Sequence, residues 1–301
     1  MKIRQVFGVL WLAAAMAACG NDDDFVAPSF IHIDAIKLRP SSDNSLPQDE
    51  GFYTHDIVSC YVQAYYPESQ RMERIGLFEL PFTVPVLYNG DVEYFVISPC
   101  IKVSGVFGMQ NYYPFYQRDT IRNLSLRSGD TLRLDTLDIF YRMERLGVRL
   151  FEPFEPTEAS LALDSVTWHR HAPADACTGE GYASVHVPDS VSRVPFYINR
   201  DFYVHYTSTT QLYLELDTRS DVPFEIYMES SHTTGGSTDV QRVMVVNPSE
   251  NWKHIYITLG ATWGWFNYNS DFRLSFAALN AEGKEGDVRI DNVRVLTTTA
   301  S

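Results

Sequence analysis

The chain has 301 residues, of which 45% are hydrophobic and 14% aromatic, and its formal net charge is −14 at pH 7. This length exceeds that of a usual single domain, so we expect more than one. The negative charge argues against binding to nucleic acid and against electrostatic adhesion to anionic lipid, and it favours neutral or basic partners.

The N-terminal end of the chain has the pattern of a signal peptide. Lys2 and Arg4 supply the positive charge that precedes an apolar run, and the run ends at Ala18. A helix needs about 20 apolar residues to cross a bilayer, and this run is shorter. These features predict a signal peptide over residues 1–18 and an exported protein.

A cysteine follows the apolar run directly. This arrangement resembles a bacterial lipoprotein signal, in which lipid is attached to the cysteine thiol and the chain is cut just before it. The resemblance implies that Cys19 is the lipidated residue, and residues 20–24 resemble the acidic export signal of surface lipoproteins of Bacteroidota. We therefore expect residues 19–29 to be an acidic tether and the protein to be lipid-anchored in the outer membrane and exposed at the cell surface. A periplasmic lipoprotein is the alternative.

Short runs in which apolar and polar residues alternate recur through the rest of the sequence. Such runs, rich in Val, Ile, Tyr and Phe and separated by Gly, Pro, Asn and Asp, predict antiparallel strands with one buried face. Representative runs are 56–66, 183–187, 212–216, 224–228, 255–259, 272–276 and 288–290. The pattern predicts an all-β protein with two consecutive antiparallel β-sandwich domains, at residues 30–145 and 146–301, divided where prolines and charges interrupt the alternation.

The first predicted domain has a distinctive centre at residues 75–97. Pro81 and Pro85 predict an extended edge segment, and Asn89-Gly90 predicts a tight turn. The stretch resembles the PEGA-like and carboxypeptidase-regulatory-like sandwiches, in which a Gly-containing strand, a Pro-containing segment and a Gly turn recur. The resemblance implies an Ig-like or PEGA-like sandwich for this domain.

Aromatic residues gather around a proline at residues 111–116, Asn-Tyr-Tyr-Pro-Phe-Tyr. They are candidates for a binding surface, and packing over an open end of the sandwich is the alternative. Two cysteines of the same domain, Cys60 and Cys100, are candidates for a disulfide, which an oxidising envelope permits. Because Cys177 leaves an odd number of thiols, one bridge at most can form, and buried free thiols are the alternative.

The second predicted domain closes with residues 286–296, where the apolar positions change register at Asp291-Asn292, as a β-bulge would produce. The Ile-Asp-Asn-Val of this stretch resembles the last strand of galactose-binding-like jelly rolls, which include many carbohydrate-binding modules. The resemblance implies a jelly-roll sandwich and, as an expectation, a glycan ligand.

The most suggestive binding candidate is an aromatic loop between two predicted strands of this domain. Exposed aromatic faces can stack on sugar rings, while amide groups hydrogen-bond hydroxyls. The candidate residues are Trp263, Trp265, Phe266, Asn267, Tyr268 and Asn269. The alternative is that the two tryptophans close one end of the core.

Evidence for a metal or cofactor is weak, and we assign neither. His169 and His171 have a spacing that places both imidazoles on one face of a strand, but the sequence identifies no third ligand. A structural calcium ion, which many carbohydrate-binding jelly rolls carry, would have Glu285, Asp287 and Asp291 as its nearest oxygen donors.

Five short motifs combine Asp, then Ser or Thr, then an aliphatic residue. They resemble the O-glycosylation site of exported Bacteroidota proteins, and ordinary alternation at strand edges is the alternative. The resemblance implies glycan on Thr120, Thr131, Thr136, Ser165 and Ser190. Such glycan would add solubility rather than activity.

The sequence contains no nucleophile elbow, phosphate-binding loop or zinc-protease motif. We therefore predict a non-catalytic surface protein that binds glycan through its C-terminal domain and contacts the membrane through its lipid alone. The main alternative is a structural or adhesive envelope protein that binds other proteins, for example through an unpaired edge strand. A glycan-processing enzyme, with carboxylates converging in a cleft, is the third possibility.

Overall fold

The computed structural model describes residues 27–42, 45–87, 92–105, 108–122, 126–155, 175–205, 207, 209–234, 237–266, 270–280 and 283–298, and the backbone of residues 169–171. Side chains are not described at residues 231–234 and 237. Several predicted features therefore lie outside the described residues: the signal peptide 1–18, Cys19, the turn at Asn89-Gly90, Ser165, Asn267, Tyr268 and Asn269.

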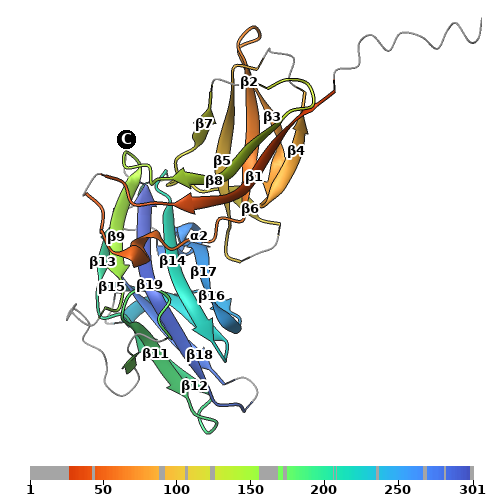
Figure 1. Ribbon diagram of the computed structural model, residues 1–301. Helices are drawn as coiled ribbons and strands as arrows, with labels where there is room; N and C mark the ends of the chain where they lie inside the picture. Colours follow the sequence, from red (N-terminus) through yellow and green to blue (C-terminus); the bar gives the residue numbers. More distant parts are fainter. Residues whose placement is uncertain are drawn as a thin grey trace, which may run out of the picture.

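The first sandwich is built from two sheets (Figure 1). One has the strand order β3-β2-β5-β6, with β7 also paired to β5, and the other has the order β4-β1-β8. The strands are β1 (Ser29–Leu38), β2 (Ser59–Tyr66), β3 (Arg71–Glu79), β4 (Phe82–Val86), β5 (Tyr94–Lys102), β6 (Gln110–Tyr112), β7 (Asp119–Ile121) and β8 (Thr131–Ile139).

Alternation in the sequence decides which faces of these strands are buried. In β2, Cys60, Val62 and Ala64 are buried on one face, while Tyr61 and Gln63 between them are only partly covered. Pro85 lies in β4, an edge strand, where its missing N–H breaks no ladder. The pairing of β1 with β8 is parallel rather than antiparallel, because the long intervening chain returns to the same end of the sheet.

The second sandwich also has two sheets. One has the order β10-β11-β19-β14-β17, with β9 also paired to β19, and the other has the order β12-β18-β15-β16, with β13 also paired to β18. The strands are β9 (Leu146–Glu152), β10 (His169–His171), β11 (Tyr182–Val187), β12 (Arg193–Tyr197), β13 (Phe202–Val204), β14 (Leu212–Ser220), β15 (Phe224–Thr234), β16 (Ser237–Val246), β17 (Ser249–Thr258), β18 (Ser270–Leu279) and β19 (Gly286–Thr298).

The predicted bulge in the closing strand is confirmed. Glu215 of β14 pairs with Arg294 of β19, but Asp217, two residues further on, pairs with Asp291. The extra residue in β19 is accommodated at Asn292, whose φ of 49° lies in the left-handed region that asparagine tolerates.

The all-β prediction with two sandwiches is confirmed, since strands account for most of the described chain. In the described residues, two short helical segments accompany the strands: the 3-10 helix η1 (Glu50–Tyr53) and the helix α2 (Gly260–Phe266). The helix α2 lies where the sequence predicts a loop.

The two sandwiches meet along a surface that we call the seam. On one side lie residues 50–56 and 113–116 of the first sandwich, and on the other lies the outer face of β14, β17 and β19. Figure 1 shows η1 beside β19, where the chain between β1 and β2 reaches down to the second sandwich. The cleft and the pocket described below both open at the seam.

Strand β14 explains why the seam is polar. Leu212, Leu214 and Leu216 point into the core of the second sandwich, so the residues between them point to the opposite face. That face carries Tyr213, Glu215 and Asp217, and the first sandwich covers it.

Candidate functional site

A buried ion pair occupies the centre of the seam. The Nε of Arg294 lies 2.5 Å from the Oε2 of Glu215, and both side chains are 0% exposed. Arg294 also donates to the carbonyl oxygens of Gly51 at 2.9 Å and Phe52 at 2.6 Å, and to that of Thr54. One guanidinium of the second sandwich therefore satisfies three carbonyls of the first, which fixes the two sandwiches relative to each other.

Tyrosines extend the same network. The Tyr113 hydroxyl donates to Glu215, and the hydroxyls of Tyr116 and Tyr256 lie 2.9 Å apart. The Tyr256 hydroxyl also accepts from the backbone N–H of Asp56 at 3.0 Å. Each of these contacts joins the first sandwich to β14 or β17 of the second.

The charges at the seam hold one another in their ionised states. Burial disfavours ionised Glu215, but the Arg294 guanidinium and His254 outweigh it, so the pKa of Glu215 is lowered. Burial, reinforced by the charge of Glu215, raises the pKa of the Tyr113 hydroxyl well above its ordinary value, so this group remains a donor. The network is therefore a set of hydrogen bonds between buried charged and polar groups that strengthen one another.

His254 lies in the same network. Its Nδ1 is 2.9 Å from Asp217 and its Nε2 is 3.3 Å from Glu215. Burial opposes protonation of His254, but the two carboxylates outweigh it, so the pKa of the imidazole is raised. Because both ring nitrogens contact carboxylates, this His–Asp pair is a structural contact rather than a general base directed at a substrate.

One side of the seam opens as a cleft of about 610 Å³. Its lining includes Tyr53, Thr54, His55, Cys177, Thr178, Asp217, Trp252 and His254. Burial, and then the Asp217 and Asp291 carboxylates, raise the pKa of the Cys177 thiol well above its usual value. The thiol therefore stays protonated, and it is a poor nucleophile.

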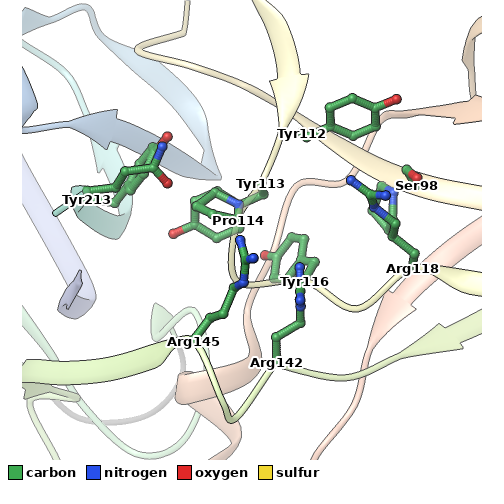
Figure 2. A pocket seen from close by; sticks show the side chains of 11 residues that line it. Ser98, Tyr112, Tyr113, Pro114, Tyr116, Arg118, Arg142, Arg145 and Tyr213 are labelled. Carbon is green, nitrogen blue, oxygen red and sulfur yellow. The ribbon is translucent and has the colours of Figure 1, made fainter. Parts of the chain in front are cut away.

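A second hollow at the seam, which we call the tyrosine–arginine pocket, has a volume of about 240 Å³. Figure 2 shows tyrosine rings and arginine side chains converging on it. The tyrosines are Tyr112, Tyr113, Tyr116 and Tyr213, the arginines are Arg118, Arg142 and Arg145, and Ser98, Pro99, Pro114 and Gln211 complete the lining. Tyr213 and Gln211 come from the second sandwich, so the pocket exists only because the two sandwiches are joined.

Two loops hold the arginines in place. The N–H of Gln117 donates to Phe140 at 2.9 Å, and the N–H of Arg142 donates to Phe115 at 2.7 Å. These bonds tie the loop after β6 to the turn between β8 and β9, and the N–H of Arg145 closes that turn on the carbonyl of Arg142 at 2.9 Å. These backbone hydrogen bonds therefore fix the two loops that carry Arg118, Arg142 and Arg145.

The pocket continues into an open hollow of about 530 Å³, lined by Gln117, Arg118, Arg142, Glu144 and Arg145. Arg142 donates from its Nε to Glu144 at 2.9 Å, and the Arg118 guanidinium lies 5.3 Å from the centre of the Tyr112 ring. Aromatic faces, guanidinium donors and an open approach are the components of a site for a polar ligand with a flat ring.

Most of the described residues of the predicted aromatic site are buried in the structure. Trp263 is 2% exposed and Phe266 is 4% exposed, so both pack in the core of the second sandwich and neither is available for stacking on a ligand. Spacing of three residues on α2 points both side chains inward, which is the core-closing alternative for Trp263. Trp265 points outward and is 56% exposed. The site that we predicted on this segment therefore retains one described aromatic residue with an accessible face.

The predicted disulfide between Cys60 and Cys100 does not form, and both thiols are free and buried. The register explains this, because Cys60 lies opposite Pro99 while Cys100 lies opposite Ser59. Residues directly opposite share a face, so an offset of one residue sends the two thiols to opposite faces of the sheet. Only Cys60 joins the core cluster of the first sandwich.

Four of the five candidates for metal ligands bind other groups or have side chains outside the described residues. His169 and His171 both lie in β10, where the side chains are outside the described set. Asp291 accepts from the N–H groups of Cys177 at 3.2 Å and Asn292 at 2.8 Å, so its oxygens hold a turn of the chain. Asp287 pairs with Arg289. The described residues contain no group of three or more metal-ligating side chains.

Four of the glycosylation candidates are exposed: Thr120, Thr131, Thr136 and Ser190. Their exposure satisfies one condition for modification. Within the described residues, no helix is long and apolar enough to cross a membrane.

The sequence reasoning identified the aromatic half of the tyrosine–arginine pocket and missed the rest. In residues 111–116 aromatics surround a proline, and all four of these aromatics line the pocket or the seam. The sequence gives no reason to bring Arg142 and Arg145, from the charged segment between the predicted domains, together with Tyr213 from a strand of the second domain. The available signal was the pair of arginines in the short segment between β8 and β9, next to an aromatic loop.

No protein-family model matches the chain, and no curated protein matches it. Among solved structures, a family 29 carbohydrate-binding module is 14% identical, with 50% of this chain and 87% of that chain covered and a TM-score of 0.33. A mutant of such a module complexed with cellulohexaose is 13% identical, with 51% and 92% covered and a TM-score of 0.33. Another mutant, complexed with mannohexaose, is 14% identical, with 50% and 90% covered and a TM-score of 0.33. At this level of similarity the matches assign neither a ligand nor a site to the chain.

Proposed function

We propose that the protein is a lipid-anchored cell-surface protein that binds glycan at the tyrosine–arginine pocket and does not transform it. The observation that carries this proposal is the convergence of two partly exposed tyrosine rings, Tyr112 and Tyr213, and three guanidinium groups on one pocket between the two sandwiches, over the buried rings of Tyr113 and Tyr116. Flat aromatic faces stack on the apolar faces of sugar rings, and guanidinium groups donate to sugar oxygens.

The size of the pocket suits such a ligand. A volume of about 240 Å³ is smaller than the roughly 300–1,000 Å³ that encloses a drug-sized molecule, so the pocket would hold a single sugar residue. The adjoining hollow of about 530 Å³ leaves room for the rest of a glycan chain.

The walls of the pocket are held in place before a ligand binds. Tyr113 and Tyr116 line the pocket, and their hydroxyls are already bound to the seam network, so their rings are held in place before a ligand arrives. A preorganised pocket loses little conformational entropy on binding.

The seam chemistry argues against catalysis. The buried carboxylates and the imidazole at the seam all contact partners within the network, and the Cys177 thiol is held protonated. A nucleophile or general base needs a free atom facing a substrate.

The test is a calorimetric titration of residues 25–301 with a panel of oligosaccharides. Tyr112→Ala should weaken binding about tenfold, because Tyr112 is a half-buried ring at the pocket wall. Tyr197→Ala is the matched control, since Arg273 lies 5.3 Å from its ring just as Arg118 lies 5.3 Å from that of Tyr112, but outside the pocket. This control should bind as the wild type does.

Two results would overturn the assignment of the site. Binding that survives Tyr112→Ala and is lost in Trp265→Ala would place the glycan on α2 instead. Absence of binding across the panel would favour a structural or adhesive envelope protein. The location is tested separately, because Cys19→Ala should abolish incorporation of labelled fatty acid and release the protein from outer membranes.

A further inference from the structure

We infer that the glycan is acidic, and that Arg118 and Arg145 hold its carboxylate or sulfate group at the mouth of the tyrosine–arginine pocket. This inference rests on the proposed function, because it names the chemical class of ligand for the same site.

The pocket is positively charged, although the protein as a whole is negative. The chain as a whole has a formal net charge of −14. Among the described residues that line the pocket and the adjoining hollow, three are arginines and one, Glu144, is a carboxylate. A positive site on a negative protein attracts an anionic group locally, while the rest of the surface repels one, and this contrast directs the anion to the pocket.

Two of the three arginines can bind an anionic group of a ligand. Arg142 is held by Glu144, with both its Nε and Nη2 2.9 Å from the Glu144 carboxylate. Neither Arg118 nor Arg145 forms an ion pair with any of the residues that the structure describes: Arg118 lies over the Tyr112 ring, and Arg145 contributes to the lowered pKa of Glu144 only from beyond ion-pair distance. Both side chains are exposed. An exposed guanidinium without a carboxylate can take one from a ligand at little desolvation cost.

Arg118 and Arg145 lie at the same pocket on two loops that are joined to each other. Arg145 and Arg118 come from two loops that backbone hydrogen bonds tie together, through Gln117 to Phe140 at 2.9 Å and Arg142 to Phe115 at 2.7 Å. Figure 2 shows the Arg145 side chain extending toward the tyrosines, with Arg118 on the Tyr112 side. A guanidinium offers two parallel N–H donors that match the two oxygens of a carboxylate or sulfate.

Different residues of the pocket therefore bind different parts of the ligand. The partly exposed rings of Tyr112 and Tyr213 contact the sugar ring, and Arg118 and Arg145 contact the acidic substituent. A uronic acid and a sulfated sugar present the same chemistry to these groups, so the experiment includes both.

The experiment compares oligogalacturonate, a sulfated galactan oligosaccharide and neutral galactan and mannan oligosaccharides, by calorimetry with residues 25–301. We expect the acidic ligands to bind about tenfold more tightly than the neutral ones, and this preference to shrink as ionic strength rises. The double variant Arg118→Gln/Arg145→Gln should lose about tenfold in affinity for the acidic ligands and little for the neutral ones.

The matched control is Arg133→Gln/Arg149→Gln, which removes the same charge from two exposed arginines that do not line the pocket. It should keep the wild-type affinities. Circular dichroism and thermal melting of each variant confirm that the fold is retained.

The outcomes distinguish the two proposals. Equal binding of neutral and acidic glycans, unchanged in Arg118→Gln/Arg145→Gln, would overturn the acidic inference and leave the proposed function standing. A loss of affinity in the control as large as in the test variant would also overturn it, because general charge would then explain the preference. Failure of every glycan to bind would remove both proposals, and binding of inorganic sulfate alone would show an anion site without a sugar subsite.

Discussion

The guanidinium of Arg294 and the carboxylate of Glu215 face each other at 2.5 Å, entirely buried between two sandwiches that are separate along the chain. Removing one partner leaves an uncompensated buried charge. We expect Arg294→Leu to lower the free energy of unfolding by about 3–5 kcal/mol, as measured by guanidinium denaturation.

The double variant Arg294→Leu/Glu215→Leu tests the cause. It should lose less stability than Arg294→Leu alone, because no charge is left unpaired. Arg149→Leu, at an exposed position, should have little effect. Equal losses in the single and double variants would mean that the carbonyl contacts of Arg294, and not the ion pair, determine its contribution.

Stability should fall as the pH rises from about 5 to about 8. Burial, followed by the Asp217 charge, raises the pKa of Asp291 to about 8 in the folded protein. An unfolded aspartate has a pKa of about 3.9, so between these values the folded state binds a proton that the unfolded state lacks. The free energy of unfolding then decreases by up to about 1.4 kcal/mol per pH unit.

His254 should act in the same direction. Its pKa is raised in the folded protein, so the stability it contributes is present at acidic pH and is lost as the pH rises through the folded-state value. Glu215 has a lowered pKa and loses its contribution only at more acidic pH. Denaturation series across this range should show a shallower slope for Asp291→Asn than for the wild type, and an unchanged slope would refute the role of Asp291.

The cysteine thiols should be unreactive in the folded protein. Burial raises the pKa of both Cys60 and Cys100 to about 12, so neither forms an appreciable thiolate at neutral pH. Residues 25–301 treated with Ellman's reagent should react slowly under native conditions and release three thiol equivalents once unfolded. Only one equivalent after unfolding without reductant would reveal a disulfide.

Substitution of the two tryptophans of α2 should change the free energy of unfolding by very different amounts. Trp263→Ala removes a buried side chain and should lower the free energy of unfolding by about 3–5 kcal/mol. Trp265→Ala should change it by about 0.5 kcal/mol or less, because this ring is exposed. Thermal or chemical denaturation measures both, and acrylamide quenching should fall in the Trp265 variant. Comparable destabilisation by the two changes would contradict their assigned places.

The sequence pattern predicted the strands but not what covers them. The spacing of Leu212, Leu214 and Leu216 correctly identified the face of β14 that packs into its own sandwich. The alternate residues Glu215 and Asp217 have the polarity of a solvent-facing surface, yet they are buried. Nothing within one strand reveals that another domain docks on its polar face, because that information lies in residues more than a hundred positions away.

Local reasoning failed in a similar way at two smaller places. Alternation placed Cys60 on the correct face of β2, but the offset against β5 that separates it from Cys100 depends on how two strands pair. Residues 260–266 contain two glycines and few strong helix formers, so their propensity does not indicate a helix. The spacing of Trp263 and Phe266 was the available signal, and burial of both side chains accounts for the turn of helix that forms.

The parallel pairing of β1 with β8 has a mechanical consequence. If the chain is held at a membrane through its N-terminal end, load enters at Ser29, and a ligand bound at the seam pulls back through the end of β8 at Ile139. Because the two strands run in the same direction, these opposed forces slide one strand along the other and strain all their hydrogen bonds at once. An antiparallel pair loaded at the same two points would open one bond at a time, so the parallel pairing would resist such a load better than an antiparallel one.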